Sequence, residues 1–96
     1  MDYTGQSIAA NYIQGFEGVG GKLHFSEDGM EFRPHSINIQ KPTPFIPYKE
    51  IKTISKRNTL GLVPNGILVT TINNDEHKFV VYKRQNIIAF LQQKQH

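Results

Sequence analysis

Histidine side chains are the groups in this chain best suited to acid–base or metal chemistry, and they occur at His24, His35, His77 and His96. Zinc motifs place their ligands in pairs only a few residues apart, and none of these histidines has such a neighbour. The chain contains no cysteine, and neither a Ser/His/Asp order nor a helical pair of histidines can be traced through it. The sequence therefore predicts no catalytic residue, no metal site and no cofactor, and we do not expect an enzyme.

A glycine-rich segment, Gly18-Val19-Gly20-Gly21, could in principle cradle a phosphate with its backbone amides. Nucleotide-binding loops of that kind lead into a helix and carry a Gly-Lys-Ser/Thr motif. Neither feature follows these glycines. We therefore interpret the segment as a tight turn between two strands.

Basic side chains are most concentrated between residues 41 and 57, where Glu50 is the only acidic residue. Such a cluster attracts an anionic lipid surface by about 1 kcal/mol per base, but lysines on a strand can equally be solvated groups that discourage aggregation. On a regular strand, Lys52 and Lys56 share one face. No aromatic-rich motif accompanies these bases, so nucleic acid is not an expected partner. The candidate lipid- or anion-binding residues are Lys41, Lys49, Lys52, Lys56 and Arg57.

The segment from Asn58 to Gly66 contains the apolar residues Leu60, Leu62 and Val63 beside these bases. Apolar residues at the tip of a loop can enter a bilayer or meet a partner protein. They can equally fold back to plug one end of a barrel, and the sequence leaves both interpretations open. The Asn65-Gly66 pair at the end of this segment predicts a hairpin turn.

Two hairpins that position these residues are indicated by apolar residues at alternate positions. Residues 22–25 and 30–33 alternate on either side of Ser26-Glu27-Asp28-Gly29, where Gly29 is expected to supply a positive φ. Residues 67–72 form the longest β-branched run, and a turn at residues 73–76 leads into a second alternating run over 77–82. These patterns predict strands on both sides of each turn.

The remaining segments complete an antiparallel β domain that ends in a helix. We expect strands over residues 10–16, 45–47 and 52–57, with one helical turn over residues 48–51. After Lys83 the apolar residues follow a helical period and form one stripe, made of Ile87, Ile88, Phe90 and Leu91. About seven short strands followed by one amphipathic helix favour a barrel or orthogonal sandwich over an open sheet, with the helix covering an open end of the barrel.

Length and composition are those of a single small domain. The chain has 96 residues, a formal net charge of +3 and no cysteine. It carries no secretion signal at its start and no apolar run long enough to cross a bilayer. We therefore expect a soluble cytoplasmic protein, complete as it stands, with peripheral attachment to a membrane as an open alternative. Its organisation is predicted to be an N-terminal extension over residues 1–9 and one domain over residues 10–96.

Three segments together resemble the GRAM domain, a pleckstrin-homology-like module. They are GVGGKLHFSEDGMEFRPHSINIQ, FIPYKEIKTISK and NGILVTTINNDEHKFVVYKRQNIIAFL. The resemblance covers roughly residues 10 to 93 and depends on the order of its elements, which are Gly21, Leu23, Ser26, Phe32, Ile46-Pro47-Tyr48, Ile51, Phe79, Arg84 and residues 87–91.

The resemblance implies two near-orthogonal sheets of about seven antiparallel strands, capped by one C-terminal helix. It also implies a non-catalytic binding module that engages an anionic membrane lipid or a protein partner. In lipid-binding pleckstrin-homology domains the first hairpin often carries clustered bases, whereas here that turn has Glu17 and the single base Lys22. The alternative is a structural or regulatory subunit that acts by self-association, for example as a homodimer, and has no lipid site.

Overall fold

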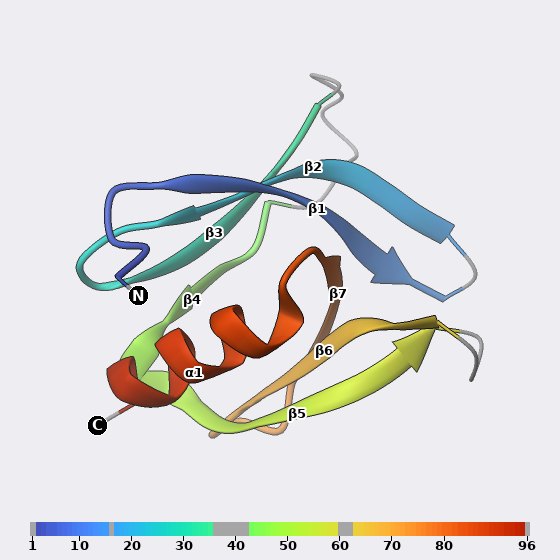
Figure 1. Ribbon diagram of the computed structural model, residues 1–96. Helices are drawn as coiled ribbons and strands as arrows, with labels where there is room; N and C mark the ends of the chain where they lie inside the picture. Colours follow the sequence, from blue (N-terminus) through green and yellow to red (C-terminus); the bar gives the residue numbers. More distant parts are fainter. Residues whose placement is uncertain (1, 16, 36–42, 60–62, 96) are drawn as a thin grey trace.

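Seven antiparallel strands and one C-terminal helix make up the computed structural model, which describes residues 2–15, 17–35, 43–59 and 63–95 (Figure 1). Neighbouring strands pair in the order β4-β3-β2-β1-β7-β6-β5, so β4 and β5 form the two edges of a single sheet. The elements are β1 (Ser7–Gln14), β2 (Glu17–Phe25), β3 (Gly29–Pro34), β4 (Phe45–Pro47), a 3₁₀ turn η1 (Tyr48–Glu50), β5 (Ile51–Thr59), β6 (Val63–Thr71), β7 (Glu76–Val81) and α1 (Arg84–Lys94).

The sheet bends into two facing layers, with β1, β2 and β3 in one layer and β5 and β6 in the other (Figure 1). α1 lies across the open side between the layers, and its apolar stripe packs into the core there. The predicted barrel of seven antiparallel strands with a terminal helix is therefore confirmed. One continuous curved sheet forms both layers.

The core fills the space between the two layers and α1. Alternate residues of the strands point inward, as strand geometry requires, and Leu23, Phe32, Ile67 and Phe79 are almost completely buried. The ring of Phe90 on α1 meets three more aromatic rings at their edges or faces, those of Tyr3, Phe25 and Tyr48. Burying each side chain of this size stabilises the fold by about 1.5–3 kcal/mol.

Both ends of α1 are fixed to the backbone of the edge strand β5. At its start, Arg84 Nη1 donates to the carbonyl oxygen of Arg57 at 3.1 Å and to that of Gly66 at 3.4 Å. Just after its end, Gln95 Nε2 donates to the carbonyl oxygens of Ile51 and Lys52 at 3.3 and 2.7 Å. The helix therefore runs alongside β5 and holds this strand in place.

The two predicted hairpins are confirmed by the pairing of β2 with β3 and of β6 with β7. In the second hairpin, Asn74 adopts the positive φ of 68° that its turn requires. β1 begins at Ser7, which is closer to the N-terminus than the predicted strand over residues 10–16. η1 confirms the predicted helical turn after β4.

Three predictions about glycines were wrong. Gly18 to Gly21 lie within β2, and the preceding Gly15 has the positive φ of 57°. Gly29 begins β3 without a positive φ, and an added Cβ there would lie 2.5 Å from the Ile46 carbonyl oxygen. Gly66 and Asn65 are part of β6, where a Cβ on Gly66 would lie 2.6 Å from the Arg57 carbonyl oxygen. At Gly29 and Gly66 the absence of a side chain permits two backbones to approach closely.

Candidate functional site

Four of the five candidate basic residues lie along one edge of the barrel, and we call them the β5 strip. Lys49 belongs to η1, and Lys52, Lys56 and Arg57 belong to β5. All four side chains are exposed. The strip extends for about 20 Å from the start of β5, since a strand rises about 3.3 Å per residue.

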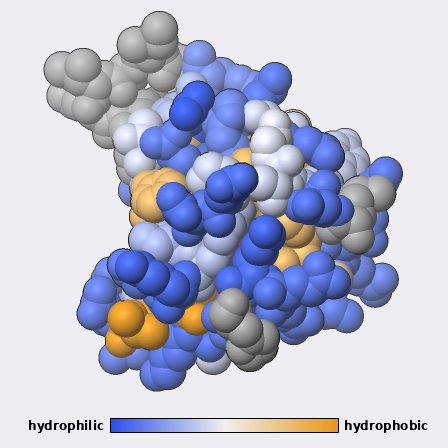
Figure 2. Space-filling view, turned by 90° about the vertical axis from the view of Figure 1, so that its left-hand side faces the viewer, coloured by the Kyte–Doolittle hydropathy of each residue, from blue (hydrophilic) through white to orange (hydrophobic). Residues whose placement is uncertain are grey.

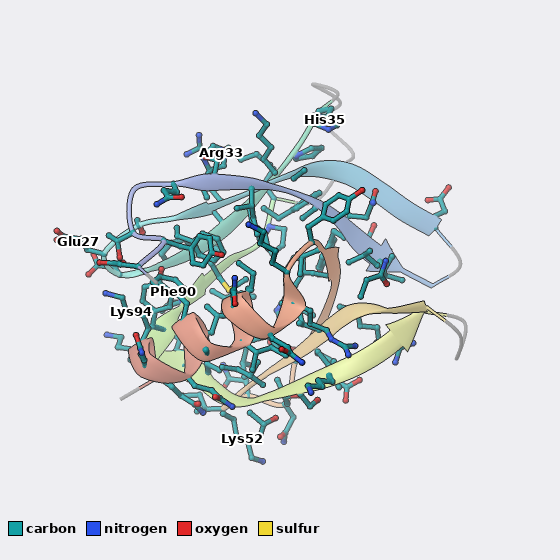
Figure 3. The ribbon with its side chains drawn as sticks, viewed as in Figure 1. Glu27, Arg33, His35, Lys52, Phe90 and Lys94 are labelled. Carbon is teal, nitrogen blue, oxygen red and sulfur yellow. The ribbon has the colours of Figure 1, made fainter. Side chains whose placement is uncertain are left out.

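A bulge in β5 determines the directions of these side chains. The register with β6 shifts between Ile51 and Thr53, so Lys52 has no partner in the ladder. The prediction that Lys52 and Lys56 share a face assumed unbroken alternation, which this extra residue interrupts. Lys56 lies opposite the buried Ile67, and Figure 3 shows Lys52 pointing away from the barrel on the β5 side.

The charges of the β5 strip are not neutralised by acidic side chains within the described part of the chain. The ion pair found among the described residues joins Arg33 to Glu31, and both of these residues lie on β3 in the other layer. Lys52 Nζ donates to Asn74 Oδ1 at 3.3 Å, which leaves its charge uncompensated. Unpaired cations in a row raise the local potential and attract anions.

Two further bases, Arg84 and Lys94, belong to α1, whose two ends contact β5, and their spacing along the chain does not predict this proximity. Arg84 reaches the carbonyl oxygen of Arg57 at one end. At the other end, Gln95 donates hydrogen bonds to the carbonyl oxygens of Ile51 and Lys52, while Nζ of the preceding Lys94 lies over the Phe90 ring, 5.8 Å from its centroid. These bases are far from β5 in the sequence, and only the packing of the helix brings them near.

The other four candidate residues are the base Lys41 and the apolar residues Leu60, Leu62 and Val63. Lys41, Leu60 and Leu62 are outside the described residues. Val63 is the first residue of β6, and only its backbone position is described. The predicted apolar loop therefore stays a prediction.

Large exposed apolar side chains within the described ranges are Phe45 on β4, Ile72 after β6 and Tyr82 after β7. They come from three different places along the chain. Figure 2 shows one face of the molecule, where hydrophilic side chains predominate and hydrophobic areas are small and separate. A broad apolar docking surface is therefore not present among the described residues of this face.

The nearest arrangement to an acid–base pair is formed by Tyr12 and His77. A hydrogen bond of 2.9 Å joins Tyr12 Oη to His77 Nδ1, and the two rings stack with their centroids 5.9 Å apart. Burial raises the pKa of Tyr12 and lowers the pKa of His77, although Asp75 acts in the opposite direction on the histidine. Because Tyr12 is buried in the core cluster, we assign this pair a structural role.

This pair makes the stability of the fold depend on pH. The lowered pKa of His77 means that the unfolded chain takes up a proton more readily than the folded chain. The stabilising contribution of neutral His77 is therefore complete above pH about 6.5 and is lost as the pH falls through the lowered value. We expect the melting temperature to fall from pH 7 to pH 5, and to fall less in His77→Gln. An equal slope in the two proteins would contradict this prediction, and their slopes above pH 7 provide the control.

The described residues lack two features that mark other classes of function. They contain no group of three or more histidine, cysteine or carboxylate side chains able to hold a metal ion. Within the same ranges, no helix is long and apolar enough to span a membrane.

Comparisons with known proteins agree with this architecture. The GRAM domain family matches residues 7–96. The C-terminal domain of an unknown protein from Leishmania infantum superposes with a TM-score of 0.78 at 22% identity, over 94% of this chain and 81% of that one. The N-terminal PH domain of human ARAP2 superposes with a TM-score of 0.71 at 17% identity, over 94% of this chain and 77% of that one. At these identities the two structures are evidence of a shared fold.

Proposed function

Because this chain belongs to the GRAM domain family, whose members are non-catalytic modules, we propose that it is a binding module that attaches peripherally to anionic membrane surfaces in the cytoplasm. The β5 strip is the contact surface in this proposal. Lys41 is a further proposed contact on the basis of the sequence.

The observation that carries this proposal is the row of four exposed bases along one edge of the barrel, none of which has an ion-pair partner among the described residues. Each base near an anionic surface contributes about 1 kcal/mol, so the row contributes about 4 kcal/mol in total. This attraction acts on the negative charge of the membrane and decreases as salt screens it.

The proposed attachment depends on charge and not on the shape of one lipid headgroup. The turn between β1 and β2 is flanked by Gly15 and the acidic Glu17. It therefore lacks basic side chains that could surround a phosphate. We expect different anionic lipids of equal charge to bind about equally well.

Self-association is the second candidate function, and an exposed aromatic ring on an edge strand favours it. Phe45 on β4 is 49% exposed, and β4 is one of the two free edges of the sheet. Two copies could pair their β4 edges and cover both rings. Such a dimer would be held by apolar contacts and backbone hydrogen bonds, so it would be insensitive to salt.

Co-sedimentation with vesicles separates the two functions. The protein is mixed with vesicles of phosphatidylcholine alone, or with vesicles that also contain phosphatidylserine, which produces a negative surface potential, at low and at moderate salt. The membrane proposal predicts binding to the anionic vesicles alone and a sharp decrease with salt. Absence of binding at both salt concentrations would refute it, and sedimentation of the free protein as a dimer would then support self-association.

A further inference from the structure

A hollow of about 370 Å³ lies on the outer face of the sheet over β1, where residues of β1, β2 and β7, His35 after β3 and Asn65 of β6 line it. Its floor includes the small residues Ala9 and Gly20, which leave the backbone of β1 and β2 uncovered. His35 and Tyr82 stand at its rim, and the Tyr82 side chain is 86% exposed. We call this feature the outer groove.

Gly20 has no side chain to fill the outer groove, although the backbone conformation at this position does not require glycine. A Cβ at this position would meet Asn11 Oδ1 at 3.4 Å and His35 Cδ2 at 3.5 Å, which are ordinary contacts, and its φ is not positive. A side chain could therefore be accommodated by the fold. Its absence makes room for part of another molecule.

Two like charges stand side by side next to the outer groove. Lys22 on β2 pairs directly with Arg33 on β3, and Ala9 in the groove pairs with Lys22 from the other side. Like charges at directly opposed positions destabilise a sheet. Arg33 Nε donates to Glu31 Oε1 on the same strand, and the Arg33 side chain is 61% exposed. This contact offsets part of the Arg33 charge, whereas Lys22 has no ion-pair partner among the described residues.

The charges of Lys22 and Arg33 also act on the neighbouring His24. Burial lowers the pKa of His24, and the charges of Arg33 and Lys22 lower it further, while Glu31 acts in the opposite direction. An anion bound between Lys22 and Arg33 would relieve their repulsion and raise the pKa of His24. The face is therefore suited to an anionic group.

The distance between the two ends of this surface indicates the length of the occupant. Lys22 and Arg33 lie on β2 and β3, while Tyr82 follows β7 on the far side of β1. Neighbouring strands are about 4.8 Å apart, so three spacings separate β3 from β7 by about 14 Å. An extended peptide covers this distance with about four residues, whereas a single small anion reaches only one end.

We propose that the outer groove and the Lys22–Arg33 pair bind an extended acidic segment of a protein partner, which crosses the strands with its carboxylates on the two bases and an apolar side chain about four residues away in the groove beside Tyr82. Figure 3 shows Arg33 and His35 on the side of the barrel opposite Lys52. A flat membrane in contact with the β5 strip would leave this face open to solution. The accessibility of this face on a membrane is the only part of the inference that rests on the proposed function.

The test uses nuclear magnetic resonance titration of the full chain with a designed probe. The probe is an acetylated and amidated ten-residue peptide with two adjacent glutamates, three serine or glycine spacers and one phenylalanine. The control peptide carries glutamines in place of the glutamates. We expect the probe to shift the amide signals of Asn11, Gly20, His35 and Tyr82 and to raise the pKa of His24, and the control peptide to bind about tenfold more weakly.

Two matched variants test the groove itself. Gly20→Val fills it and is expected to weaken probe binding about tenfold. Gly18→Val adds the same side chain on the same face of β2, at a position outside the groove lining where a Cβ would make ordinary contacts with Ile13 Cδ1 at 3.5 Å and Asn11 Cβ at 4.0 Å, and it should bind like the original chain. Lys22→Gln with Arg33→Gln should also weaken binding with little change in melting temperature, because it removes both the Lys22–Arg33 repulsion and the solvent-exposed Arg33–Glu31 ion pair.

The proposal is overturned if the probe shifts no signal at millimolar concentration, if the shifts cluster on β5, or if the glutamine peptide binds equally well. Equal binding by the two glycine variants would also overturn it. The peptide comparison uses the unchanged chain, so it stays decisive even where a variant is unstable. Because Gly20→Val leaves the β5 strip intact, its vesicle binding should be unchanged, and failure of one proposal is distinguishable from failure of the other.

Discussion

Replacing Gly21 with alanine is expected to destabilise the fold by about 3 kcal/mol or more. A Cβ at this position would lie 2.2 Å from the carbonyl oxygen of Arg33 and 2.8 Å from both Phe32 Cζ and Pro34 Cα. Two of these atoms belong to the backbone of the neighbouring strand, so β2 and β3 would have to separate. For a domain of this size, we expect a melting temperature lower by about 12–24 °C.

Gly18→Ala is the control for this prediction, because Gly18 lies on the same strand and faces outward. Its nearest neighbours to an added Cβ are Ile13 Cδ1 at 3.5 Å and Asn11 Cβ at 4.0 Å. Glycine weakens a strand by about 0.5–1 kcal/mol relative to alanine, so this variant should be as stable as the original chain or slightly more stable. A similar loss in both variants would show that the close approach at Gly21 is not the cause.

Replacing Lys49, Lys52, Lys56 and Arg57 together by glutamine should abolish binding to anionic vesicles. Four bases at about 1 kcal/mol each correspond to a decrease in affinity of about a thousandfold. All four side chains are exposed, so the melting temperature should change little. Co-sedimentation measures the affinity, and thermal unfolding confirms that the variant is folded.

A charge-matched variant shows whether position or net charge causes the loss. Replacing Lys22, Arg33, Lys78 and Lys83 by glutamine removes the same number of positive charges from positions outside the β5 strip. We expect this variant to retain most of its affinity. Equal losses in the two variants would mean that the protein binds membranes through its overall charge and that the β5 strip has no special role.

Local patterns predicted much of the fold because they depend on neighbouring residues. Alternation on both sides of a turn located the β2–β3 and β6–β7 hairpins, and the change to a helical period after Lys83 located α1. The glycines of β2 were misinterpreted because glycine is common both in turns and where a backbone or ring approaches a strand. Only the contact of Gly21 with β3 and with the ring of Phe32 distinguishes the second case.

The surface was less predictable, since it depends on register and on packing between distant segments. The bulge at Lys52 is visible only in the pairing of β5 with β6. Sequence reasoning placed a single base near the first hairpin and missed that Arg33 lies directly opposite Lys22. Counting residues along β3 from Gly29 could have suggested this pairing once the hairpin register was assumed.

The most direct test of the proposed membrane contact is to determine which face of the barrel touches the vesicle. The chain has no cysteine, so a single cysteine can carry a fluorophore. One variant has it at Thr53, exposed on β5, and the other has it at Ala9, exposed on the opposite layer. Each is bound to anionic vesicles that contain a lipid with a nitroxide quencher on its headgroup. We predict strong quenching at position 53 and little at position 9, whereas stronger quenching at position 9, or equal quenching at both, would contradict attachment through the β5 strip.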